Sequence, residues 1–124
     1  MAADLAAAPQ GERLRVHVKV DTGMGRMGTR LEALPDMLQQ LHASDRFDVE
    51  GIFSHFGNAD QVTRPISDTQ FHNFQRACSL AKEAGISLKW KHLANSAATL
   101  TRPEAHVNMV RPGIAVYGVH PGNA

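Results

Sequence analysis

Short apolar segments alternate with segments of helical periodicity along this sequence, and this alternation constrains the fold more than any other feature. Residues 14–20 carry a valine at every second position from residue 16, which predicts a half-buried strand, and residues 34–41 then carry leucine and methionine at helical spacing. A strand followed by a helix and then by another strand is typical of a parallel sheet with right-handed crossovers. The sequence therefore predicts an α/β fold.

The same order of strand and helix recurs further along the chain. Residues 49–54 predict a second strand, and a long helix is expected from Ser67 or Asp68, as its N-cap, to Gly85. The other expected elements are strands over residues 87–93 and 107–110, a short helix over residues 96–100 and a last short element over residues 114–117. Four such units occupy the 124 residues, whereas a closed eightfold barrel needs about 250. Two architectures fit this length: a small open sheet, or half of a barrel.

Charge and composition indicate what kind of partner the chain binds. Lysine and arginine total 13 against 12 aspartate and glutamate residues, so the net charge of +1 offers no electrostatic footprint for nucleic acid. No apolar run is long enough to span a membrane, and residues 1–13, which resemble the tail of a preceding helix and a linker, lack the basic start of a secretory signal. A small molecule is the expected partner. The cytoplasm is the expected location, and a single cysteine, Cys78, suits it.

Polar side chains gather where each expected strand ends. The carboxyl ends of parallel strands share one edge of a sheet, and barrel enzymes place their chemistry at that edge, so this placement favours the barrel. Regular alternation also puts Lys19 on the strand face opposite the valines. The residues concerned are Lys19, Asp21 and Arg26 after the first strand, His55 and Asp60 after the second, Asn95 and Ser96 after the third, and Arg111 with Gly113 after the fourth.

Residues 23–28 match G-x-G-x-x-G, which in the turn after a strand is a fingerprint of dinucleotide binding. Such a site also needs an acidic residue at the end of the second strand, to bind the ribose hydroxyls. That strand ends here in Ser54 and His55, so we favour a barrel active site over a dinucleotide site. The seven histidines include no closely spaced ligand pair, so no metal site is predicted.

Two turns are suited to bind a phosphate group. Ser96 is expected to cap a short helix whose first N–H groups attract anions, although a plain N-cap without a ligand explains the same residues. The turn at Arg111-Pro112-Gly113 offers a second set of backbone donors, because glycine lets the main chain approach a ligand closely. Phosphate sites of barrel enzymes lie after the last two strands, where these turns would fall.

Four segments taken together resemble alanine racemase, the pyridoxal phosphate enzyme family that interconverts L- and D-alanine. They are KVDTGMGRMG at residues 19–28, GIFSHFGNAD at residues 51–60, HLANSAATL at residues 92–100 and NMVRPGIAVYG at residues 108–118. The resemblance implies a partial (β/α)8 TIM barrel, with about four βα units in residues 14–120 as strands five to eight of the family barrel. It also implies that residues 121–124 begin the link to a C-terminal β-domain.

The resemblance further implies a role for each matched residue, with Lys19, Arg26 and His55 at the catalytic centre. Lys19 matches a lysine that is often carbamylated, and this carbamate holds Arg26 against the phenolic oxygen of pyridoxal 5'-phosphate. A carbamate would turn a repulsive pair of cations into an attractive pair. Arg111 matches the arginine that faces the pyridine nitrogen, which stays unprotonated because a guanidinium keeps its proton. The remaining matches are His55, which supports Arg111, Asn95 in the same polar shell, and Ser96, Gly113 and Ile114 at the phosphate.

The function implied is racemisation of alanine through a pyridoxal phosphate aldimine, by a cytoplasmic homodimer that supplies D-alanine for cell-wall peptidoglycan. The family's Schiff-base lysine and its opposing tyrosine match nothing in this chain, so the isolated chain is expected to be inactive. Half a barrel also leaves two sheet edges unpaired, from which we expect self-association or pairing with the missing half. Two alternatives remain: a racemase of broader amino-acid specificity, and a noncatalytic module that binds a phosphate-bearing ligand.

Overall fold

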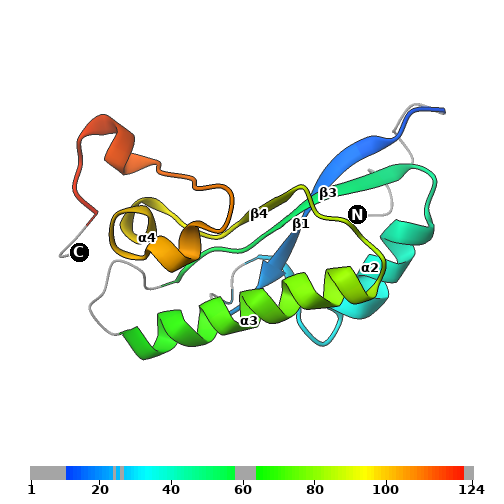
Figure 1. The fold of residues 1–124 in the computed structure, drawn as a ribbon, viewed down its shortest axis with the longest axis horizontal. Helices are drawn as coiled ribbons and strands as arrows, with labels where there is room; N and C mark the ends of the chain where they lie inside the picture. The colour runs from blue at the N-terminus through cyan, green and yellow to red at the C-terminus, as the bar shows by residue number, and fades with distance from the viewer. Residues whose placement is uncertain (1–10, 24, 26, 58–63, 122–124) are drawn as a thin grey trace.

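The computed structural model describes residues 11–23, 25, 27–57 and 64–121, which form an α/β fold around one sheet (Figure 1). The predicted alternation of strands and helices is confirmed. In chain order the elements are strands β1 (Leu14–Asp21) and β2 (Thr29–Arg30), helix α2 (Leu34–Ala43), strand β3 (Phe47–Phe53), helix α3 (Arg64–Glu83), strand β4 (Trp90–His92), helix α4 (Ser96–Thr101), and the 3-10 helices η1 (Pro103–His106) and η2 (Ile114–Tyr117).

The strands of this sheet all pair in parallel. Their order is β2-β1-β3-β4, and one parallel bridge joins His92 to Met109 beyond β4. The strand predicted over residues 107–110 is therefore reduced to this bridge, and the one predicted over residues 87–93 has only three residues. The side chain of Asn108 accepts from the Lys91 N–H at 2.7 Å and donates to the Lys89 carbonyl at 3.0 Å. It thus occupies main-chain groups that a longer ladder would use.

Helices α2 and α3 pack on one face of the sheet and enclose the core. Val18 of β1 and Ile52 of β3 are buried against these helices. Leu38 of α2 and Phe74 of α3 complete the apolar layer, with 0% and 1% of their surface exposed. The valines of β1 thus supply the inward face that their period of two predicts.

Helix α3 begins earlier than the sequence pattern predicts. It starts at Arg64, so Ser67 and Asp68, the two expected N-caps, lie inside the helix, and Ser67 is buried. Pro65 is compatible with the first turn, because the N–H that proline lacks has no helical partner there. The predicted end is confirmed: Gly85 has a φ of +82°, the left-handed conformation that commonly follows a helix.

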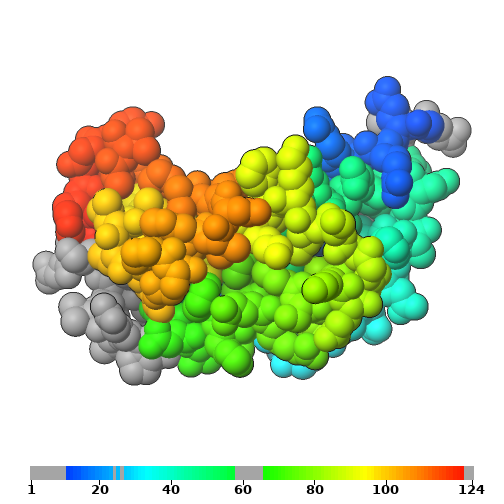
Figure 2. Space-filling model, in the orientation of Figure 1, coloured from blue at the N-terminus to red at the C-terminus, as the bar shows by residue number. Residues whose placement is uncertain are grey.

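The other face of the sheet, which we call the open face, carries His17, Lys19, Phe53 and His92. On the side of the molecule away from α3, the outline is concave between the start of β1 and the segment that holds η1 and η2 (Figure 2). The open face therefore combines polar side chains with access to solvent.

A bulge in β3 makes room for a histidine ring on the open face. Val16 pairs with Val49, whereas His17 pairs with Gly51, so Glu50 is an extra residue in β3. A Cβ atom on Gly51 would lie 2.7 Å from the His17 ring, well inside van der Waals contact. Only glycine lets the ring lie across the strand at this position.

Candidate functional site

Residues from separate segments of the chain meet at the carboxyl edge of the sheet, which we call the rim. Because the strands are parallel, the segments that follow them emerge on the same side. Two of the predicted site residues, Arg26 and Asp60, lie outside the described residues. The predicted residues placed at the rim are Lys19 near the end of β1, His55 just after β3, Asn95 and Ser96 at the start of α4, and Arg111, Gly113 and Ile114 after the Met109 bridge.

Arg111 is anchored by two main-chain carbonyls. Its backbone N–H donates to the Ala94 carbonyl at 2.9 Å, and its Nη2 donates to the Ser54 carbonyl at 2.5 Å. Its Nε is buried and has no hydrogen-bond partner among the described residues. Burial lowers the pKa of this guanidinium, which nevertheless stays protonated at physiological pH. A buried cation with an unused donor is suited to bind an acceptor atom of a ligand.

Phe53 contacts both cations of the rim. The centre of its ring lies 5.5 Å from Cζ of Arg111 and 5.9 Å from Nζ of Lys19, within the range of cation–π attraction. Lys19 makes no ion pair in the part of the chain that the structure describes. Sequence reasoning did not single out Phe53. Its position beside Lys19 in the register of β1 and β3 is a property of the sheet and not of any local pattern.

Asn95, and not Ser96, is the N-cap of α4. Its Oδ1 accepts from the Ala98 N–H at 3.0 Å, and its backbone is extended, with φ of −83° and ψ of −170°. The prediction that Ser96 caps this helix is therefore wrong. Both residue types make good N-caps, and the extended backbone at Asn95 decides which of them takes the position.

Ser96 instead joins the two turns that sequence reasoning assigned to phosphate binding. Its Oγ accepts from the Ala115 N–H at 3.2 Å and is buried at the junction of α4 and η2. In the second turn, a Cβ atom on Gly113 would meet nothing within 4 Å, so its main chain is open to a ligand. Ile114 follows it, half exposed. The hydrogen bond from Ala115 to Ser96 thus joins the two turns at the rim.

Two histidines form a polar layer deeper on the open face. His17 Nδ1 and His92 Nε2 lie 2.8 Å apart, and His17 Nε2 is 3.8 Å from the Glu50 carboxylate. The His92 ring stacks on Phe53, with ring centres 4.8 Å apart and planes 3° apart. Burial, followed by the charges of Arg111 and His17, lowers the pKa of His92 to about 4. His92 is therefore neutral at pH 7 and adds no third positive charge to the rim.

The glycine-rich turn after β1 does not have the structure of a dinucleotide fingerprint. Strand β2, and not a helix, follows Gly28. The N–H groups of Gly23 and Gly25 both donate to Oδ1 of Asp21, at 3.0 Å each, so they are already engaged. Gly28 has a φ of +118°, and a Cβ there would lie 2.8 Å from the Asp21 backbone nitrogen. These glycines shape a turn around Asp21, and the dinucleotide alternative is excluded.

The residues that the structure describes lack the features of two other kinds of site. No group of three or more histidine, cysteine, aspartate or glutamate side chains there is placed to hold a metal ion. None of the helices in those residues has both the length and the apolar composition needed to cross a membrane.

Comparisons with known proteins match the chain to one family. A family model described as "Alanine racemase, N-terminal domain" matches residues 1–121. Alanine racemases of Frankia casuarinae and Salinispora tropica are 45% and 42% identical to it, over 94% and 90% of this chain and 31% of each relative. The crystal structure of alanine racemase from Streptomyces lavendulae superposes with a TM-score of 0.88 at 36% identity, over 97% of this chain and 32% of that one. The chain therefore spans about a third of the length of these relatives.

Proposed function

The chain belongs to the alanine racemase N-terminal domain family, and we propose from this premise that it forms one part of an amino-acid racemase that uses pyridoxal 5'-phosphate. The observation that carries the proposal is the rim, where Arg111 Nε has no hydrogen-bond partner among the described residues, near two backbone turns joined through Ser96. In this proposal β1, β3, β4 and the Met109 segment are strands five to eight of the family barrel. Residues 14–120 are then its second half, and the open face is the barrel interior.

The residues at the rim fit pyridoxal 5'-phosphate. Arg111 has donors left after its bond to Ser54, and these can hold the pyridine nitrogen. The phosphate can approach the open main chain of Gly113 and Ile114. The Ser96 hydroxyl can donate its hydrogen to a phosphate oxygen while it accepts from the Ala115 N–H. A cationic end and a phosphate-binding end on one surface match the two ends of this cofactor.

The protein side chains orient the reactants and control where protons reside. When bound, the cofactor withdraws electrons from the amino acid and makes its α-proton removable. Arg111 keeps its own proton, so it orients the ring without protonating it and leaves racemisation dependent on the family's two bases. In this scheme a carbamate on Lys19 holds Arg26 at the phenolic oxygen. His55 and Asn95 complete the polar surroundings of Arg111.

A chimera tests this function in a complete enzyme. This chain replaces the matching segment of the Frankia casuarinae racemase, to which it is 45% identical over 120 residues. We expect the chimera to convert L-alanine to D-alanine, and we expect Arg111→Ala to lower kcat by at least about tenfold, since it removes a charge held at the cofactor. Cofactor absorbance and circular dichroism show whether the chimera is folded and loaded. A folded, loaded chimera without racemase activity would contradict the proposal.

The isolated chain is proposed to be inactive, because no residue in it matches the family's Schiff-base lysine or opposing tyrosine. The test incubates the chain with pyridoxal 5'-phosphate and L-alanine and measures D-alanine by chiral chromatography. The expected rate equals that of free cofactor. Sustained turnover, with a lysine adduct trapped by borohydride, is the result that overturns this part.

The same chimera separates the remaining alternatives. Faster turnover of L-serine or L-lysine than of L-alanine supports a racemase of broader specificity. Binding of cofactor through its phosphate without turnover, in a chimera that retains both bases, supports a noncatalytic module. For the whole protein we propose the location, oligomeric state and role of its family, namely a cytoplasmic homodimer that supplies D-alanine for cell-wall peptidoglycan.

A further inference from the structure

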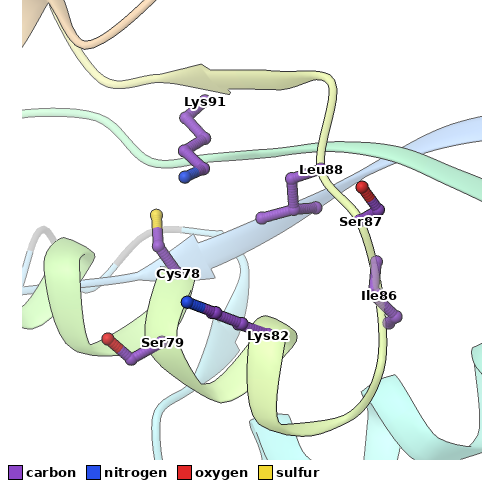
Figure 3. Close-up of a pocket in the computed structure, with 7 residues that line it drawn as sticks. All are labelled: Cys78, Ser79, Lys82, Ile86, Ser87, Leu88 and Lys91. Carbon is purple, nitrogen blue, oxygen red and sulfur yellow. The ribbon is translucent and has the colours of Figure 1, made fainter.

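A separate pocket lies on the helix-covered side of the sheet, between α3, the loop that follows it and β4 (Figure 3). Its volume is about 390 Å³, within the range of sites that hold small molecules. Lys82 of α3 and Lys91 of β4 both extend toward Cys78 (Figure 3). Lys91 precedes His92 in β4, so its side chain leaves the strand on the side opposite the open face. The pocket is therefore distinct from the rim.

The charges in this pocket are unbalanced. Its lining includes two lysines and two serines but no carboxylate among the described residues, and neither lysine makes an ion pair there. The charge of Lys91 reaches Cys78: burial raises the pKa of this thiol, and Lys91 opposes that rise. Two ammonium groups that line the same pocket without an anion repel each other. A bound anion would remove this repulsion and be held by both cations.

We propose that this pocket binds a small organic phosphate, with its phosphate group between Lys82 and Lys91. Two ammonium groups match a phosphate dianion in charge, and the hydroxyl of Ser87 can donate to one of its oxygens, whereas the Ser79 hydroxyl already donates to the Gln75 carbonyl at 3.2 Å. Buried Ile86 and half-buried Leu88 provide an apolar wall for the carbon part of the ligand. The proposal does not depend on the racemase function, because none of these residues lies at the rim.

Because the chain has only one cysteine, its alkylation reports on ligand binding in this pocket. Glycerol 3-phosphate is titrated at constant ionic strength, and two signals are recorded: heat by calorimetry, and the rate at which iodoacetamide alkylates Cys78. We expect a Kd on the order of 1 mM and a fall in the alkylation rate of about threefold or more at saturation, because the ligand covers the thiol and neutralises Lys91. Sodium chloride at equal ionic strength should do neither.

Lysine variants show whether the two ammonium groups hold the ligand. Lys82→Met and Lys91→Met should each raise the Kd by at least about tenfold, since each removes one charged hydrogen bond. Lys89→Met is the matched control, because Lys89 does not line the pocket and its Nζ lies 4.0 Å from Glu50, whose carboxylate is beside His17 of the open face, so this variant should leave the Kd unchanged. Lysine-to-glutamine variants replace any methionine variant that loses its far-ultraviolet circular dichroism.

Three results would overturn the proposal. One is a Kd that both pocket variants leave unchanged. Another is alkylation that chloride slows as much as glycerol 3-phosphate does, which indicates general screening of charge. The last is tighter binding of succinate than of glycerol 3-phosphate, which assigns the pocket to carboxylates and not to phosphates.

Discussion

The two faces of the sheet differ in what covers them and in what their side chains can do. On the helix-covered face, Ile52 and Phe74 are almost inaccessible to water, whereas His17 and Lys19 on the open face remain partly exposed. Burial of apolar surface contributes about 25 cal/mol per Å², so the first face supplies most of the stability. The second face is left to hold charges and hydrogen-bonding groups. One strand serves both purposes because its successive side chains point to opposite faces.

The largest expected effect is a loss of stability, and it is tested by replacing one phenylalanine on each side of the sheet. Phe74→Ala should destabilise the chain by about 4 kcal/mol, because it removes a ring that is 1% exposed and leaves a cavity between α3 and the sheet. Phe53→Ala should cost about 2 kcal/mol, since that ring is only half buried. Urea unfolding followed by circular dichroism measures both. Equal losses would mean that the open face contributes to stability as much as the covered face does.

The next effect is a loss of stability in acid, caused by His92. The folded chain keeps this ring neutral down to about pH 4, whereas the unfolded chain binds the proton near pH 6.5. The stability is therefore fully present above pH 6.5 and falls as the pH is lowered from 6.5 to 4, by at most about 3 kcal/mol.

Urea unfolding at several pH values measures this slope, and His92→Gln is the control. Carboxylates that titrate below pH 5 contribute equally to both proteins, so the difference between them isolates His92. A variant with the same slope as the parent chain would contradict a buried, neutral His92.

The smallest expected effect tests the bulge on the open face. Gly51→Ala places a Cβ where the His17 ring lies and should cost about 2 kcal/mol through overpacking and loss of the bond to His92. His17→Ala should restore much of that loss in the double variant, because it removes the clash. Unfolding of the two single variants and the double variant measures the coupling. Additive losses of stability would show that the His17 ring and a Cβ at residue 51 do not compete for this space.

Local patterns predicted the elements well and their ends less well. The valine alternation of β1, the leucine spacing of α2 and the left-handed Gly85 after α3 are each set by a few neighbouring residues, and all three are confirmed. The prediction that Ser67 is the N-cap of α3 is wrong: serine is a common N-cap, but this serine is buried inside the helix. The shortened pairing beyond β4 depends on the side chain of Asn108, which no period of apolar residues reports.

The candidate site could also be predicted only in part from local patterns. The order of polar residues after each strand predicted which residues the rim would gather, and their roles at a cofactor stay predictions. The partners that these residues have could not be foreseen in the same way. His17 and His92 are 75 positions apart along the chain, and Arg111 reaches Ser54 from 57 positions away. Such pairs depend on strand register, which the sequence pattern leaves open within a residue or two.

The sequence by itself determined the α/β class, the face of β1 that enters the core and the segments that carry polar chemistry, because these follow from periodicity and from the positions of glycine and proline. Only the tertiary structure decided that β3 bulges at Glu50, that Asn95 caps α4 and that His92 stays neutral under Phe53. The physical reason is how far apart along the chain the interacting residues are. Periodicity records whether a side chain meets water or the core, whereas a register, a cap or a shifted pKa depends on which distant group it meets there.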